Sequence, residues 1–289
     1  MTNDVNSTIK DMLKKRLNDG NKGTFGALNI ISGSKYYRGA ASLSVQAALR
    51  SGVGTVRLVS TERVISSVAA KLDECVYLPV NETENGTIEA DDALRKLGET
   101  KPSQATLVGC GMTDCPETEK LVSALLRNYD GGLVIDADGL NAIKDDPSVL
   151  KTTKRIPIIT PHVGEMAKLT GKTVDEVKES KLRTAMDFAM EHNCIVVLKD
   201  ATTVVCSPEE RRFILDRKNS GMAKGGSGDV LAGIIASLLA QGYSEYNAAV
   251  LGTAIHSKAG ELAAEELTEY AMLPSDVVKY ISQAIKDAK

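Results

Sequence analysis

The stretch Asn219-Ser-Gly-Met-Ala-Lys-Gly-Gly-Ser-Gly-Asp229 runs directly into the apolar segment Val230-Leu-Ala-Gly-Ile-Ile-Ala-Ser-Leu-Leu-Ala240. This order predicts a glycine-rich turn followed by a buried helix whose first turn carries Asp229. Amide groups at a helix N-terminus lack partners within the helix and lie at the positive end of its dipole, so they favour an anion such as phosphate. Glycine lets the backbone approach that anion closely. The stretch therefore predicts a phosphate-binding loop.

Asp229 is the candidate general base of this loop. A carboxylate beside a phosphate cradle suits a group that takes the proton from an attacking hydroxyl. The alternative is that Asp229 only caps the helix that follows it. Three glycines before Asp229 are more than capping requires, and we therefore favour the catalytic interpretation.

Composition excludes several classes of protein. Aromatic residues make up only 4% of the 289 residues and Trp is absent, which argues against a stacking platform for single-stranded nucleic acid. A net charge of −3 gives no basic footprint for nucleic acid either. No apolar run is long enough to span a membrane and the N-terminus does not resemble a signal peptide, so we expect no membrane partner and a cytoplasmic location. Five unclustered cysteines indicate reduced thiols with structural roles.

Apolar, β-branched runs alternate with helical patterns along the chain, which predicts a three-layer α/β/α fold with a mostly parallel central sheet. The last three runs, near 194–198, 203–205 and 213–215, are short and closely spaced, so a short antiparallel edge is expected. No linker composition divides the chain, and a single domain over 1–289 is predicted. Ile9, Met12, Leu13 and Leu17 share one helical face, which predicts an N-terminal amphipathic helix within residues 1–20.

Polar residues follow several predicted strands, at the edge where open α/β sheets bind ligands. Asp136 and Asp138 come directly after a buried strand and could hold a divalent cation through waters, although either could cap the next helix instead. His162 and Glu165 follow another strand; His162 could donate to a substrate or cap a turn, and Glu165 could lie in a metal or phosphate shell. Lys199 closes a third strand and suits a nucleotide phosphate, with a plain hairpin turn as the alternative.

Two further turns of small residues follow strands. One is Ser32–Ala40, which opens a helix predicted from Ala40 to Arg50, and the other is Gly109–Met112. Either could let a ligand lie against the backbone, and either could be a structural turn. His256 lies in a helical pattern, where we expect a histidine whose hydrogen bonds are satisfied. The Walker motif is absent, and no Gly-x-Gly-x-x-Gly follows the first strand.

Taken together, these loops resemble the ribokinase-like superfamily and, within it, the ADP-dependent NAD(P)H-hydrate dehydratase family. The resemblance covers roughly residues 22 to 276. The matching segments are Lys22-Gly-Thr-Phe-Gly26, Ile31-Ser-Gly-Ser34 with Arg38-Gly-Ala40, Ile135-Asp-Ala-Asp138-Gly-Leu-Asn141, Thr160-Pro-His162-Val-Gly-Glu165, Leu198-Lys199-Asp-Ala201, Ala223–Gly233, Leu251–Gly260 and Pro274-Ser-Asp276.

The resemblance implies repair of the hydrated cofactors NADHX and NADPHX. In that reaction ADP phosphorylates the ring hydroxyl of the S-form, phosphate leaves, and AMP and NADH or NADPH remain. It implies that Asp229 takes the hydroxyl proton. It also implies that the transferring phosphoryl group contacts the amides of Gly226, Ser227 and Gly228, and that the hydrate contacts Ala40, Gly111 and His162. The implied nucleotide contacts are Lys199, Asp200, Ala201, Thr202, Thr203 and Gly228. Mg²⁺ is implied to contact Asp136 and Glu165 weakly and through water.

The resemblance further implies a homo-oligomer, a tetramer. The family's epimerase partner domain is expected to be absent, because the chain is too short to hold it. Asp200 and Lys224 depart from the family pattern, in which glycine and threonine are frequent, so nucleotide preference is the feature most open to change. Two rival functions share the same loops. One is an ATP-dependent dehydratase, and the other is a vitamin-precursor or sugar kinase such as a hydroxyethylthiazole kinase. A catalytically silent nucleotide sensor is disfavoured because Asp229 and its glycines are present.

Overall fold

The computed structural model describes residues 4–288, in which nine strands form one sheet. Apolar, β-branched runs form the central strands, which are covered on both faces, whereas the two edge strands are partly exposed. The strands are β1 (Ala27–Ile31), β2 (Thr55–Thr61), β3 (Val76–Val80), β4 (Ala105–Val108), β5 (Gly132–Ile135), β6 (Ile158–Ile159), β7 (Ile195–Leu198), β8 (Thr202–Cys206) and β9 (Arg212–Asp216).

The sheet order is β3-β2-β1-β4-β5-β6-β7-β8-β9. Every pairing from β3 to β7 is parallel, whereas β7 with β8 and β8 with β9 are antiparallel. The predicted mostly parallel sheet with a short antiparallel edge is therefore confirmed.

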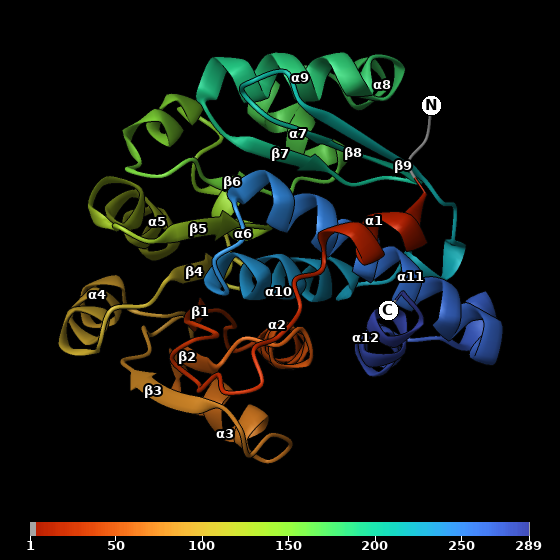
Figure 1. Ribbon diagram of the computed structural model, residues 1–289. Helices are drawn as coiled ribbons and strands as arrows, with labels where there is room; N and C mark the ends of the chain where they lie inside the picture. The colour runs from red at the N-terminus through yellow and green to blue at the C-terminus, as the bar shows by residue number, and fades with distance from the viewer. Residues whose placement is uncertain (1–3, 289) are drawn as a thin grey trace.

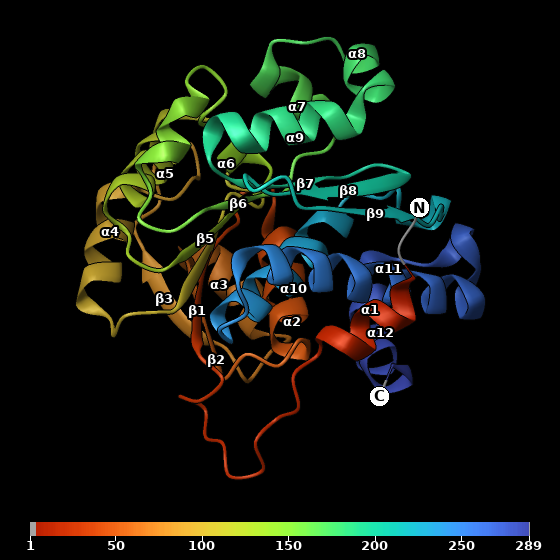
Figure 2. The same cartoon turned by 45° about the horizontal axis from the view of Figure 1, so that its top comes forward.

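Helices cover both faces of the sheet, as Figures 1 and 2 show. One core contains β-strand side chains together with α1, α2, α3, α10, α11 and α12, and the other contains those of α4 to α9. The helices are α1 (Val5–Met12), α2 (Arg38–Arg50), α3 (Glu62–Ala69), α4 (Ala90–Glu99), α5 (Pro116–Asn128), α6 (Asp138–Asn141), α7 (Val163–Thr170), α8 (Val174–Glu179), α9 (Lys181–His192), α10 (Ser227–Ala240), α11 (Glu245–Ala271) and α12 (Pro274–Asp287), with the 3₁₀ turns η1 (Pro147–Thr152) and η2 (Ser220–Met222).

Two expected helices differ in extent. The N-terminal helix expected within residues 1–20 is observed only as α1, and residues 1–3 lie outside the described part. Helix α1 ends with Leu13 as its C-cap, and the amide of Lys14 donates to the Tyr243 hydroxyl at 2.8 Å instead of continuing the helix. Leu17 is consequently 62% exposed rather than packed. The helical pattern of residues 174–192 predicts one helix, whereas the structure divides it at Ser180, whose φ of −122° is not helical.

The parallel strands end at one edge of the sheet, and the loops that follow them carry the predicted site residues. These loops meet the N-terminus of α10, which packs on α2 and on β4 and β5. No helix among residues 4–288 is long and apolar enough to cross a membrane.

Candidate active site

The glycine-rich loop adopts the predicted turn into α10. Gly226 is the N-cap with φ of +106°, a conformation that L side chains rarely adopt, and a Cβ there would lie 2.6 Å from Leu43 Cδ1. The amide of Ser227 donates to the carbonyl of Lys224 at 3.2 Å, so it is already used within the loop. Among the described residues, the amides of Gly228 and Asp229 have no backbone partner. They are the groups left for an anion, which shifts the predicted phosphoryl cradle by one residue.

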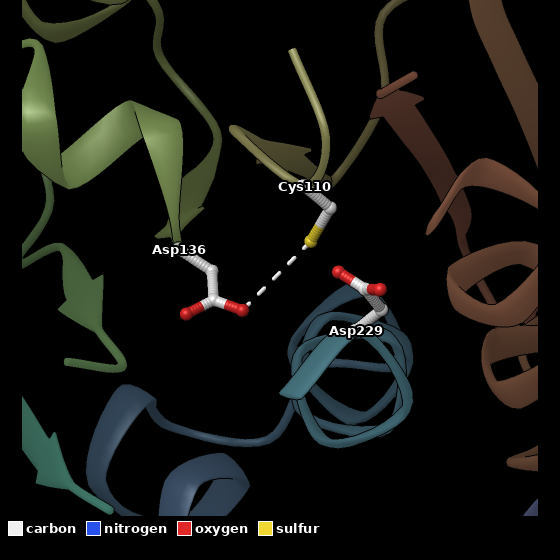
Figure 3. Close-up of side chains that lie close together, drawn as sticks. All are labelled: Cys110, Asp136 and Asp229. Carbon is white, nitrogen blue, oxygen red and sulfur yellow. Dashed lines mark hydrogen bonds between the residues drawn. The ribbon is translucent and has the colours of Figure 1, made fainter. Parts of the chain in front are cut away.

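Asp229 lies in the first turn of α10 and faces two loops of the sheet edge, as Figure 3 shows. One ligand atom each of Asp229, Asp136 and Cys110 lie within 4.8 Å of one another. Burial and the negative charge of Asp136 raise the pKa of Asp229 to about 6. A carboxylate with a pKa close to neutrality is suited to accept a proton from a substrate hydroxyl.

A buried ion pair lies beside Asp229. Lys199 Nζ is 2.7 Å from Asp136 Oδ1, and Asp136 is 1% exposed. Burial disfavours the charge on Lys199, but Asp136 and Glu165 outweigh it and raise the pKa of Lys199. A Cβ on Gly228 would lie 3.1 Å from Lys199 Nζ, so this ammonium lies directly under the anion loop. Lys199 therefore adds a fixed positive charge where phosphate is expected.

His162 caps helix α7. Its Nδ1 accepts from the amides of Gly164 at 2.9 Å and Glu165 at 3.2 Å, while a Glu165 carboxylate oxygen accepts from the His162 amide at 2.8 Å. This reciprocal arrangement is a capping box. The imidazole is 61% exposed, and its other nitrogen, Nε2, lies 3.5 Å from Glu165 Oε1. The capping alternative is thus observed, and the predicted substrate contact would have to use Nε2.

A cavity of about 920 Å³ lies between the sheet edge, η2, α10 and α11. Several loops far apart in sequence contribute to it, as the sequence predicted. The predicted site residues that line it are Asp136, His162, Glu165, Lys199, Asp200, Ala201, Thr203, Gly226, Ser227, Gly228 and Asp229. Thr202 is not among them: its hydroxyl donates to Asp216 Oδ1 at 2.7 Å, because successive strand residues point to opposite faces.

Ala40 and Gly111 lie together but do not line this cavity. A Cβ on Gly111 would lie 2.8 Å from Ala40 Cβ, so the backbone at Gly111 packs closely against Ala40. Gly111 follows Cys110 directly, and Cys110 Sγ is 3.9 Å from Asp136 Oδ2. The two predicted substrate residues therefore lie on a different side of the Asp229 centre from the cavity.

Three side chains have contacts at the site that the sequence did not predict. Cys110, expected to be structural only, lies between Asp136 and Asp229, and burial and these two charges raise the pKa of its thiol. His256 lines the cavity, and its buried Nε2 has no hydrogen-bond partner among residues 4–288, so the histidine is not fully satisfied as expected. Burial lowers the pKa of His256 to about 4, which keeps it neutral. The Lys224 ammonium donates to the carbonyls of Tyr270 and Met272, which ties the loop to the end of α11.

The carboxylates fit Mg²⁺ only in part. Asp136 and Glu165 both face the cavity, but one oxygen of Asp136 is engaged by Lys199. Asp138 neither caps α6 nor faces the cavity; it accepts the amide of Thr113 at 2.8 Å. Hard oxygen ligands suit Mg²⁺, whereas the thiol of Cys110 does not. These residues allow contact with Mg²⁺ through waters, which stays a prediction.

The sequence of this chain matches a known protein family. The model of the NAD(P)H-hydrate dehydratase family matches residues 28–283. A relative from Neisseria meningitidis, named ADP-dependent (S)-NAD(P)H-hydrate dehydratase, is 32% identical over 258 residues, covering 88% of this chain and 82% of that protein. The chain spans about half the length of the curated bifunctional NAD(P)H-hydrate repair enzymes it matches, with 52% of their length covered.

Solved structures agree with the fold. The ADP/ATP-dependent NAD(P)H-hydrate dehydratase from Bacillus subtilis, crystallised with ATP and Mg²⁺, superposes with a TM-score of 0.84 at 25% identity, covering 97% of this chain and 96% of that one. A ribokinase-like superfamily protein from Enterococcus faecalis gives 0.85 at 22% identity, covering 98% and 94%, which supports the ribokinase-like fold alone. From its sequence, its fold and the loops at its sheet edge, this chain belongs to the NAD(P)H-hydrate dehydratase family.

Proposed function

We propose that this protein uses ADP to convert the S-forms of NADHX and NADPHX to NADH and NADPH, with release of AMP and phosphate. The observation that carries the proposal is the position of Asp229. Its carboxylate, with a pKa raised to about 6, lies beside unpartnered amides at the α10 N-terminus and opens onto a cavity large enough for a nucleotide. ADP is chosen over ATP because the relative from N. meningitidis carries that name.

In the proposed reaction, Asp229 accepts the proton of the ring hydroxyl. The oxygen of that hydroxyl attacks the terminal phosphorus of ADP, and AMP leaves. The amides of Gly228 and Asp229 and the ammonium of Lys199 stabilise the charge on the phosphoryl oxygens. The C–O bond then breaks, phosphate departs with the bonding electrons, and the adjacent ring carbon loses a proton to restore the double bond. Hydroxide is a poor leaving group and phosphate a good one, so the detour lowers the barrier.

Other residues position the two substrates in this proposal. Lys199, Asp200, Ala201 and Thr203 line the nucleotide side of the cavity, and the Asp200–Lys181 ion pair fixes the loop. His162, Ala40 and Gly111 contact the hydrate. Mg²⁺, when bound, neutralises phosphate charge, and Asp136 and Glu165 would hold its waters. A homotetramer in the cytoplasm completes the proposal.

The test is an assay of purified protein with (S)-NADHX, Mg²⁺ and either ADP or ATP, followed by reduced-nicotinamide absorbance and by free phosphate. We expect absorbance and phosphate to rise together, faster with ADP than with ATP. Nucleotide consumption with a phosphorylated product and no recovered absorbance would instead identify a kinase. Absorbance that fails to recover with either nucleotide, in folded protein, would refute the proposal.

A further inference from the structure

The segment Lys35-Tyr36-Tyr37-Arg38 presents four consecutive exposed side chains after the carboxyl end of β1. Tyr36 is 72% exposed and Tyr37 is 56% exposed. Neither phenol has a hydrogen-bond partner among the described residues. Because the chain has only eleven Tyr and Phe residues, eight and three, and no Trp, two adjacent exposed rings are a concentrated use of scarce aromatic surface. Rings of this kind are suited to stack against a base.

Two cations flank these rings. Among residues 4–288, no carboxylate lies within 4.0 Å of the charged groups of Lys35 or Arg38, whereas Lys144, Lys181 and Lys199 each pair with an aspartate. Lys35 Nζ lies 5.4 Å from the centre of the Tyr36 ring, and Arg38 donates to the carbonyl of Lys35 and the hydroxyl of Ser67. The segment therefore offers positive charge and aromatic faces together, which matches a ligand that carries phosphates and a base.

The segment is fixed next to the reacting centre. The amide of Gly33 donates to the carbonyl of Cys110 at 2.9 Å, and the Ser32 hydroxyl donates to the same carbonyl at 2.7 Å. A Cβ on Gly111 would lie 2.7 Å from Tyr37 Cβ, so Tyr37 rests directly on the loop that carries Cys110 to Asp229 and Asp136. The segment is thus held against the substrate side of the site.

None of residues 32–40 lines the nucleotide cavity. The substrate NADHX is itself a dinucleotide, of which only the nicotinamide ring must reach Asp229. Its diphosphate and adenosine must leave the centre on a side that ADP does not occupy. Lys35 is two residues from Tyr37, so their Cα atoms are at most about 8 Å apart. A Cβ on Gly39 would meet no atom within 4 Å, so the surface beside the segment is open.

We propose that Lys35, Tyr36, Tyr37 and Arg38 bind the non-reacting part of the dinucleotide substrate. The two cations contact its diphosphate, and the tyrosines stack on its adenine. This inference rests on the proposed function. The segment lies outside the reacting centre and binds the substrate and the transition state equally. Its loss therefore raises KM and leaves kcat unchanged.

The test compares two substrates in two variants. Tyr36→Ala removes one ring, and Lys35→Met removes the charge but keeps the side-chain stem that packs on Gly86. Each variant is assayed with (S)-NADHX and with hydrated reduced nicotinamide mononucleotide, which has the reacting ring but neither the diphosphate bridge nor adenosine. Tyr270→Ala, in which the altered side chain is 97% exposed, and Lys10→Met, at an exposed lysine of α1, are the matched controls.

We expect each variant to raise KM for NADHX about tenfold, equivalent to about 1.4 kcal/mol, with kcat and KM for ADP within twofold of wild type. With the mononucleotide, variant and wild type should be equal. An equal loss on both substrates, or no loss on either, would overturn the proposal. A Lys35→Met effect confined to NADPHX would overturn the diphosphate assignment. Wild-type turnover of NADHX confirms the proposed function separately, so the two failures are distinguishable.

Discussion

Asp229→Asn should lower kcat by a factor on the order of 10²–10⁴ while ADP still binds. Asparagine keeps the shape of the side chain, but at neutral pH it cannot accept the hydroxyl proton. Since the proposed nucleotide contacts are amides and Lys199 rather than this carboxylate, ADP affinity measured by calorimetry should stay within a few-fold of wild type. Steady-state assays with NADHX give the rate.

The pH profile gives the matching control. Asp229 must be ionised to act, and its pKa is raised to about 6, so wild-type kcat/KM should fall about tenfold per pH unit below that value. The residual activity of Asp229→Asn should lack this limb. A folded variant that keeps more than about a tenth of wild-type turnover would reduce Asp229 to a structural residue of α10.

Lys199→Met should both destabilise the protein and weaken ADP binding. The substitution leaves Asp136, which is 1% exposed, as an uncompensated buried carboxylate. Breaking a buried pair in this way costs about 3 kcal/mol of unfolding free energy. It also removes the ammonium under the anion loop, so we expect KM for ADP to rise at least about tenfold. Urea unfolding at pH 7.5 and nucleotide titration measure the two effects.

Two further variants separate the causes. Lys181→Met breaks the Lys181–Asp200 pair at the rim, where Asp200 is 33% exposed, and should cost no more than about 1 kcal/mol. Asp136→Leu combined with Lys199→Met removes both charges and should recover most of the stability, but not ADP binding. If Lys199→Met were as stable as wild type, or if the double variant recovered ADP affinity, the role given to this pair would be wrong.

The fold could be predicted because its signals are local. Continuous apolar runs such as Ile195–Leu198 can only be strands covered on both faces, and they appear where expected. Glycines before an apolar helix predicted the turn at Gly226 correctly, since positive φ leaves few other residues. The break at Ser180 was missed because the helical pattern continues across it. The early end of α1 depends on Tyr243, which is 229 residues away from Lys14.

The site was predictable in its carboxylates and loops but less so in its contacts. Strand ends identified Asp136 and Lys199, yet their pairing needs the register of β5, β6 and β7. Cys110 was overlooked because a lone cysteine in a small-residue turn carries no signal; only its packing against Asp136 and Asp229 reveals it. The sequence does not show which face of the strand Thr202 takes, because successive strand residues point to opposite faces. The strained Ala137, with φ of +51°, likewise has no sequence signature.

The most direct test of the proposed reaction follows the oxygen of the ring hydroxyl. NADHX prepared by hydrating NADH in ¹⁸O-labelled water carries the label at that position. The enzyme is then given this substrate with unlabelled ADP and Mg²⁺ in ordinary water, and the released phosphate is analysed by mass spectrometry. If the hydroxyl is phosphorylated before it leaves, each phosphate formed must contain one ¹⁸O atom. Unlabelled phosphate, with NADH formed and the label lost to water, would contradict the account.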